Sequence, residues 1–192
     1  MPSILIVVIV LVLFIGMITG SYNRLVGLRQ GVKRSWADID AELRRRHDLI
    51  PNLVETVKGY ASHESETLEN VIRARNAAIA APGNGAVGSA ATAEALKNEN
   101  MLSGALRQIF ALSESYPQLK ADANFRQLQE ELSRIESHIA ISRQGYNGQV
   151  QIYNTTVETF PTSLIAGSFG FLKEEFFEVD DPAVRDVPVV RF

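Results

Sequence analysis

Two groups of polar residues in this sequence are spaced so that they could form one buried charged site. The first group lies in the run RRRHD and includes Arg46 and Asp48. The second group falls at steps of seven, four and seven residues, which places its members on one face of a helix beside an apolar row. It consists of Glu136, Arg143, Asn147 and Asn154. In an antiparallel pair of helices, we expect Arg46 and Asp48 to face Glu136 and Arg143.

This buried polar layer has two interpretations. In the structural one, hydrogen bonds and ion pairs fix the register of the helices, as a polar core residue does in a coiled coil. In the functional one, Asp48, Glu136 and Arg143 form the charged site of an enzyme such as a hydrolase. We favour the structural interpretation, because buried ion pairs are also structural devices.

Other catalytic and metal-binding patterns are missing from the sequence. It contains no Cys, and its three His are not arranged as a His-Glu-x-x-His pair. The Gly-rich run PGNGAVGS lacks the Lys-Ser/Thr of a phosphate-binding loop, and there is no Gly-x-Ser-x-Gly motif. A formal net charge of −3 gives no electrostatic basis for binding nucleic acid. We therefore predict no catalytic residues, no metal, no cofactor and no nucleic-acid partner.

The N-terminal segment is predicted to cross a membrane. The run ILIVVIVLVLFIGMI carries no charge and is about long enough to span the hydrocarbon core of a bilayer. A secretory signal peptide is the alternative, but no basic residue precedes the run and no small-x-small cleavage site follows it. We favour an uncleaved anchor in contact with lipid through Ile4, Leu11, Phe14 and Ile18.

Basic residues after the anchor predict its orientation. Arg24, Arg29, Lys33 and Arg34 follow the run, and the first acidic residue after it is Asp38. By the positive-inside rule, the N-terminus lies outside and the rest of the chain in the cytoplasm, in a single-pass protein of the cytoplasmic membrane.

Long amphipathic helices are predicted to make up the rest of the chain. Apolar residues recur at steps of three and four over 32–80, which indicates a narrow helical face for partner helices. Pro51 either kinks this helix or lies in the first turn of a new one capped by Asp48, and in both cases the chain is expected to continue in the same direction. Helices over 91–116 and 122–160 follow, the second with Asp122 as its N-cap and about 58 Å long.

The predicted fold is therefore all-α, with an N-terminal transmembrane helix followed by an antiparallel up-and-down bundle of three to four long helices. The anchor covers residues 1–21 and the bundle 22–161, with a linker at about 81–90. The 122–160 helix packs antiparallel to the 32–80 helix, and the 91–116 helix covers only the membrane-distal half. A tail over 162–192 holds many of the Phe residues together with several acids, and we expect it either to cap the bundle, which we favour, or to touch the bilayer.

Several segments resemble the LemA family of bacterial membrane proteins. The resemblance includes the motif DLIPNL and the doubled Tyr-Asn, and it covers nearly the whole chain beyond the anchor. It is carried by WADIDAELRRRHDLIPNLVETVKGYASHE (36–64), LENVIRAR (68–75), YPQLKADANFRQLQEEL (116–132), RQGYNGQVQIYNTTVETFP (143–161) and GFLKEEFFE (170–178). The resemblance implies an N-terminal membrane anchor, an antiparallel helical bundle, no known enzymatic activity and a role in the cell envelope.

The predicted function is that of a non-enzymatic, membrane-anchored helical scaffold or adaptor of the bacterial cell envelope. Its expected partners are the lipid bilayer, other membrane or envelope proteins, and further copies of the same chain. One alternative is a membrane-surface sensor whose tail responds to lipid packing. The other is a hydrolase with a buried Asp/Glu/Arg site.

Overall fold

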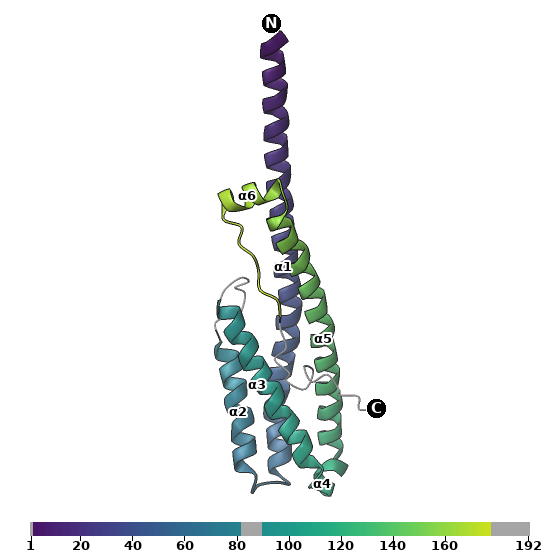
Figure 1. Cartoon of the computed structure of the whole chain (residues 1–192). Helices are drawn as coiled ribbons and strands as arrows, with labels where there is room; N and C mark the ends of the chain where they lie inside the picture. The colour runs from purple at the N-terminus through teal and green to yellow at the C-terminus, as the bar shows by residue number, and fades with distance from the viewer. Residues whose placement is uncertain (1, 82–89, 178–192) are drawn as a thin grey trace, which may run out of the picture.

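The computed structural model describes residues 2–81 and 90–177, and within these ranges it contains six helices and no strand (Figure 1). The predicted all-α fold is therefore confirmed. A single long helix, α1 (Pro2–Lys58), projects far beyond the others and then forms one side of a bundle of antiparallel helices. Residues 82–89 of the expected linker and residues 178–192 of the expected tail lie outside the described residues.

The N-terminal part of α1 has the character of a membrane span. Ile4, Leu11 and Phe14 are exposed along a part of the helix on which no other element packs. Ile18 is half-buried, and from Leu25 onward one face of the same helix is buried in the bundle. The chain is thus a single-pass membrane protein whose anchor and bundle share one helix of 57 residues, about 85 Å long.

The helix α1 continues through Pro51, so the alternative of a helix break at this residue is wrong. Proline has no N–H, and the carbonyl oxygen of His47 therefore lacks the donor that residue 51 normally supplies. In its place, Nε of Arg75 donates a hydrogen bond of 2.8 Å to this oxygen. A side chain from a neighbouring helix thus satisfies the group that the proline leaves unpaired.

The expectation that residues 32–80 run in one direction is also wrong. The chain leaves α1 after Lys58, turns over residues 59–64 and returns antiparallel as α2 (Ser65–Ala80). The turn begins with a hydrogen bond of 2.8 Å from the Ala61 N–H to the Val57 carbonyl. It contains no proline and no residue with positive φ, and its one sequence marker is Gly59, directly after Lys58, which we did not use to predict a helix end.

The remaining helices follow the predicted order. The α2–α3 hairpin, completed by α3 (Ala90–Ser113), covers the membrane-distal half of α1 (Figure 1). After the short α4 (Pro117–Ala121), α5 (Ala123–Glu158) returns alongside α1 toward the membrane. The Asp122 side chain accepts a hydrogen bond of 2.8 Å from the Phe125 N–H, which confirms the predicted N-cap. The last helix, α6 (Thr162–Phe169), lies across α1 where the anchor meets the bundle.

The hydrophobic core is divided into two parts along the bundle. The membrane-proximal part is built mainly on α1, α5 and α6, and includes Trp36, Tyr146 and Phe177. The membrane-distal part joins α1 to the α2–α3 hairpin and the first half of α5. On α1 the first part ends at Leu43 and the second begins at Ile50, so the run RRRHD lies at the boundary between them.

The Arg75–His47 hydrogen bond can be tested with a double-mutant cycle. Arg75→Met should lower the free energy of unfolding by about 1.5–3 kcal/mol. The reason is that the His47 carbonyl loses its hydrogen bond from the charged Arg75 side chain. In a Pro51→Ala background the same substitution should cost less than about 0.5 kcal/mol, because the backbone N–H that the substitution restores can bond to the His47 carbonyl. Urea unfolding of the detergent-solubilised chain gives these values, with Arg73→Met as the control. Equal costs of Arg75→Met in both backgrounds would contradict the assignment.

Candidate functional site

The buried guanidinium of Arg46 lies at the centre of a charged cluster between the two parts of the core. Arg46 is only 1% exposed. Its Nη1 donates to Glu136 Oε1 (2.6 Å) on α5 and to Ser103 Oγ (2.9 Å) on α3, and its Nη2 donates to Glu99. His47 Nε2 lies 2.9 Å from the other oxygen of Glu99. The cluster therefore connects α1 to α3 and α5 at one level of the bundle.

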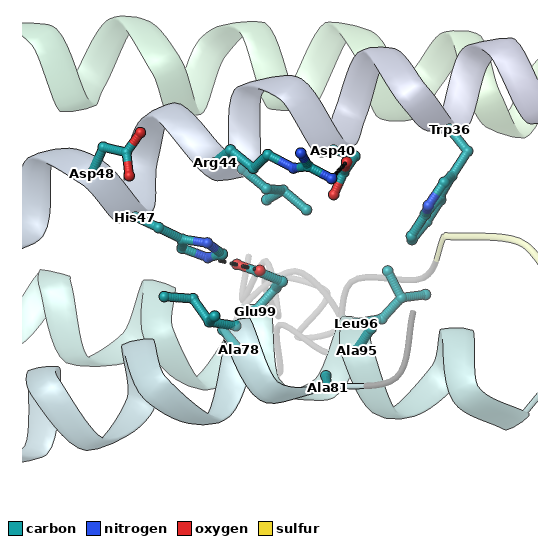
Figure 2. A pocket seen from close by; sticks show the side chains of 12 residues that line it. Trp36, Asp40, Arg44, His47, Asp48, Ala78, Ala81, Ala95, Leu96 and Glu99 are labelled. Atoms are coloured by element: carbon teal, nitrogen blue, oxygen red, sulfur yellow. Dashed lines mark ion pairs between the residues drawn. The ribbon is translucent and has the colours of Figure 1, made fainter. Parts of the chain in front are cut away.

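The structure brings only part of the predicted polar layer into this cluster. Arg46 and Glu136 form an ion pair across α1 and α5, as their predicted positions required. Asp48 is exposed and lines the pocket that Glu99 also lines (Figure 2), whereas Glu136 and Arg143 line a different one, so the expectation that Asp48 faces these two residues is wrong. The reason is helix geometry, because Asp48 lies two residues after Arg46, about 200° around α1, and cannot share the face that carries Arg46 toward Glu136.

Three members of the cluster were missed in the sequence. Glu99 and Ser103 lie four residues apart on α3, so they share one helix face, but among the polar residues of that helix they do not stand out. His47 lies next to Arg46, yet it was considered only as a metal ligand. No group of three or more His, Asp or Glu within the described residues is arranged to hold a metal ion.

Two pockets lie beside the cluster, and they separate the charged residues. One, of about 290 Å³, is lined by His47, Asp48 and Glu99 together with Trp36 and apolar side chains (Figure 2). The other, of about 450 Å³, is lined by Glu136, Arg143 and Ser103. Asp48 therefore does not share a pocket with Glu136 and Arg143.

The two Asn of the predicted layer have a different role, because they bind an extended segment of the chain. Residues 170–177 follow α6 and run back along the bundle; we call them the strap. Asn154 donates to the Glu174 carbonyl (2.8 Å) and accepts from the Glu174 N–H (2.9 Å). Asn147 makes the same pair of bonds with Phe177, at 3.1 and 2.7 Å.

Each Asn is preceded by a Tyr that adds a third hydrogen bond to the strap. The Tyr153 hydroxyl donates to the Leu172 carbonyl and the Tyr146 hydroxyl to the Glu175 carbonyl, both at 2.9 Å. Seven residues of helix rise about 10.5 Å, and three residues of extended chain span about 9–10 Å. The two Tyr-Asn pairs, seven residues apart, therefore match backbone groups three residues apart. The third Tyr-Asn pair differs, because Asn23 is exposed.

Every third side chain of the strap is buried. Phe171, Glu174 and Phe177 are buried, whereas the two residues between each of them are exposed. Phe171 lies against the Tyr22 ring, with ring centroids 5.6 Å apart, and beneath the Arg29 guanidinium. Phe177 lies near Trp36, and the Arg143 guanidinium sits 4.2 Å from the centre of its ring. Arg143 thus holds the strap.

The buried carboxyl of Glu174 is the least satisfied group of the strap. Its Oε2 is buried and has no hydrogen-bond partner among the described residues. Burial raises the pKa of Glu174 above its usual value, while Lys33 and Arg29 oppose this shift. Burial likewise raises the pKa of the Tyr146 hydroxyl, which keeps it protonated as a donor.

The Asn154 bonds predict how the strap exchanges its amide hydrogens. Asn154→Ala removes two hydrogen bonds, worth about 2 kcal/mol together, and should speed exchange at the Glu174 amide by ~30-fold. Asn23→Ala, in the exposed Tyr-Asn pair, should leave this rate unchanged. Hydrogen exchange followed by NMR or mass spectrometry measures it. A Glu174 amide that exchanges at the same rate in the Asn154→Ala variant would show that the strap is held by other contacts.

The Glu174 carboxyl predicts a pH dependence of strap binding. Its folded-state pKa is raised, so the bound strap takes up the proton more readily, and binding strengthens as the pH falls through the raised pKa. Glu174→Gln should therefore slow exchange of the strap amides at neutral pH and remove this dependence. Glu175→Gln, an exposed neighbour of the same charge, should retain it. A pH dependence that survives in Glu174→Gln would assign it to another group.

Comparison with known proteins gives the family. A family model described as the LemA family matches residues 35–192. The magnetosome protein MamQ 1 of Paramagnetospirillum magneticum is 23% identical over 95% of this chain and 73% of its own length. MamQ of Magnetospirillum gryphiswaldense is 24% identical over the same shares, and Protein LemA of Metamycoplasma hominis is 25% identical over 88% of this chain and 74% of its own. The resemblance seen in the sequence is thereby confirmed, and the chain belongs to the LemA family.

Proposed function

We propose that this protein is a non-enzymatic, membrane-anchored scaffold of the bacterial cell envelope, which holds partner proteins at the bilayer surface. The observation that carries this proposal is the continuity of α1. One helix forms both the membrane span and one side of the bundle. The bundle therefore projects from the membrane as a rigid extension of its anchor, rather than as a domain on a flexible linker.

The arrangement of the buried charges supports a structural role over catalysis. The Nη1 and Nη2 atoms of Arg46 donate their hydrogen bonds to side chains of the bundle itself, namely Glu99, Glu136 and Ser103, rather than into a pocket open to a substrate. A hydrolase based on Asp48, Glu136 and Arg143 needs the three groups in one cleft, but they line two different pockets. We therefore assign the cluster the role of fixing the register of α1, α3 and α5.

The orientation of the protein is part of the same proposal. Arg24, Arg29, Lys33 and Arg34 follow the anchor within 16 residues of Ile18, and the first acidic residue after it is Asp38. The positive-inside rule places the bundle in the cytoplasm and the N-terminus outside, with the anchor in the cytoplasmic membrane. The MamQ relatives are named as magnetosome proteins, and their names refer to no reaction. These names are consistent with an architectural role for this chain.

Exposed apolar side chains on the bundle are suitable positions for contact with partners. Ile141 and Ile152 on α5 and Ile72 on α2 are at least two-fifths exposed. Scattered apolar residues are normal on a protein surface, so exposure alone does not identify a binding face. An experiment that detects contact at each position separately is needed.

Photo-cross-linking in living cells tests the scaffold and its orientation together. A photoreactive amino acid at Ile141 should capture a defined set of membrane or envelope proteins, or a second copy of this chain. The same amino acid at the exposed, charged Glu69 serves as the control and should not capture this set. Captured proteins must have cytoplasmic parts if the proposed orientation holds. Recovery of the monomer alone from every exposed position would overturn the scaffold, and capture of exported proteins would overturn the orientation.

A further inference from the structure

The helix α6 and its flanks form an uncharged, apolar element at the base of the anchor. From Thr159 to Leu172 the sequence contains no charged residue. Four large apolar side chains of this stretch are at least half exposed, in contrast to Ile165 and Ala166, which are buried against the bundle. The four are Phe160 (76%), Leu164 (65%), Phe169 (56%) and Leu172 (77%).

The position of α6 on α1 fixes its height relative to the membrane. The membrane-proximal core that contains Ile165 and Ala166 is packed against Ile18, a residue of the last turn of the apolar anchor. The Phe169 ring contacts the Tyr22 ring edge-on, with centroids 5.0 Å apart. From Ile18 to Tyr22 the helix rises only about 6 Å. Figure 1 shows α6 lying across α1 at this level, instead of running along it.

We infer that α6 is an interfacial helix that docks into the phospholipid bilayer next to the anchor. A membrane that surrounds the exposed span 4–17 must reach the level of α6, because α6 packs on α1 directly after this span, beside Ile18. Aromatic and aliphatic side chains are favoured at the boundary between headgroups and acyl chains, where an interfacial helix buries them by about 5–10 Å. The exposed apolar residues of α6 are thus covered by lipid.

The charged residues around α6 are placed as this docking requires. Glu158 and Lys173, the nearest charged residues on either side of the uncharged stretch, form an ion pair with one another. Arg24 is exposed on α1, less than one turn beyond Tyr22, where it can meet lipid phosphates. The lipid-facing surface is therefore free of uncompensated acids.

The absence of Cys makes a direct test possible in the full-length chain. A spin label is attached at Leu164→Cys, with the chain reconstituted in vesicles of phosphatidylcholine and phosphatidylglycerol at 3:1. Ile141→Cys is the matched control, because Ile141 is 68% exposed but lies midway along α5. Leu11→Cys marks the hydrocarbon core. The ratio of collision rates with oxygen and with a water-soluble nickel chelate reports the depth of each label.

If α6 docks into lipid, the oxygen-to-nickel ratio at position 164 lies several-fold above that at 141 and approaches the ratio at position 11. A ratio equal to that at 141 overturns the inference. Protection from nickel without enrichment of oxygen, together with spin–spin broadening that disappears on dilution with unlabelled chain, would show that a second copy covers α6 and would also overturn it. Leu172→Cys provides an independent label three residues after the end of α6. This label is expected to give the same result as the label at position 164.

Discussion

The continuity of α1 is the constraint on which the rest of the structure depends. A helix that begins as a membrane span cannot bend away at the bilayer surface without breaking its hydrogen bonds, and here it continues for many further turns. The helices α2, α5 and α6 pack directly on this rod, α3 packs on α2, and α4 packs on α5. Pro51 is the residue of α1 that opposes this continuity most strongly, because proline disfavours a helix interior more than the glycines of α1 do. Arg75 removes the difficulty by supplying the missing donor, so a residue of α2 preserves the helix on which α2 itself packs.

Buried polar groups give this bundle its specificity, and they do so in two ways. Leucine and isoleucine rows on long helices tolerate several registers, since shifting one helix by a turn or a heptad replaces one apolar contact by another. The Arg46 cluster excludes such shifts, because a displaced α3 or α5 leaves a buried guanidinium or carboxylate without its partner. The Tyr-Asn pairs act on a segment that has no helical period. They fix the strap through its backbone, while Phe171 and Phe177 fill the spaces between the aromatic and basic side chains of α1 and α5.

The sequence predicted correctly those features that depend on residues within a single segment of the chain. The apolar period of α5 and its cap at Asp122 depend on residues close together in the chain, and both were predicted. The reversal at 59–64 was missed, because a single glycine, Gly59, marks the helix end, without a proline or a longer Gly-rich run beside it. Asp48 was misplaced for a separate reason, because a residue two positions after Arg46 on the same helix cannot share its face. The role of Asn147 and Asn154 was missed for a different reason. The spacing of seven residues between Asn147 and Asn154 indicates only that the two share a helix face. That this face binds extended backbone follows from the spacing of three residues between their partners, Glu174 and Phe177, which lie 20–30 residues farther along the chain.

The strap and the membrane-distal part of the bundle differ in how strongly they are held in place. The distal bundle is stabilised by a continuous apolar core, whereas the strap depends on six side-chain hydrogen bonds and three buried side chains. Each such hydrogen bond adds about 1 kcal/mol, so the strap is released by a smaller free energy than the bundle requires to unfold. The buried Glu174 carboxyl lowers this free energy further at neutral pH. Because α6 precedes the strap directly, the strap begins beside Tyr22, where the anchor meets the bundle, and runs to Trp36. Loss of the six hydrogen bonds frees the strap without removing a contact of the Arg46 cluster, which lies farther from the anchor along α1.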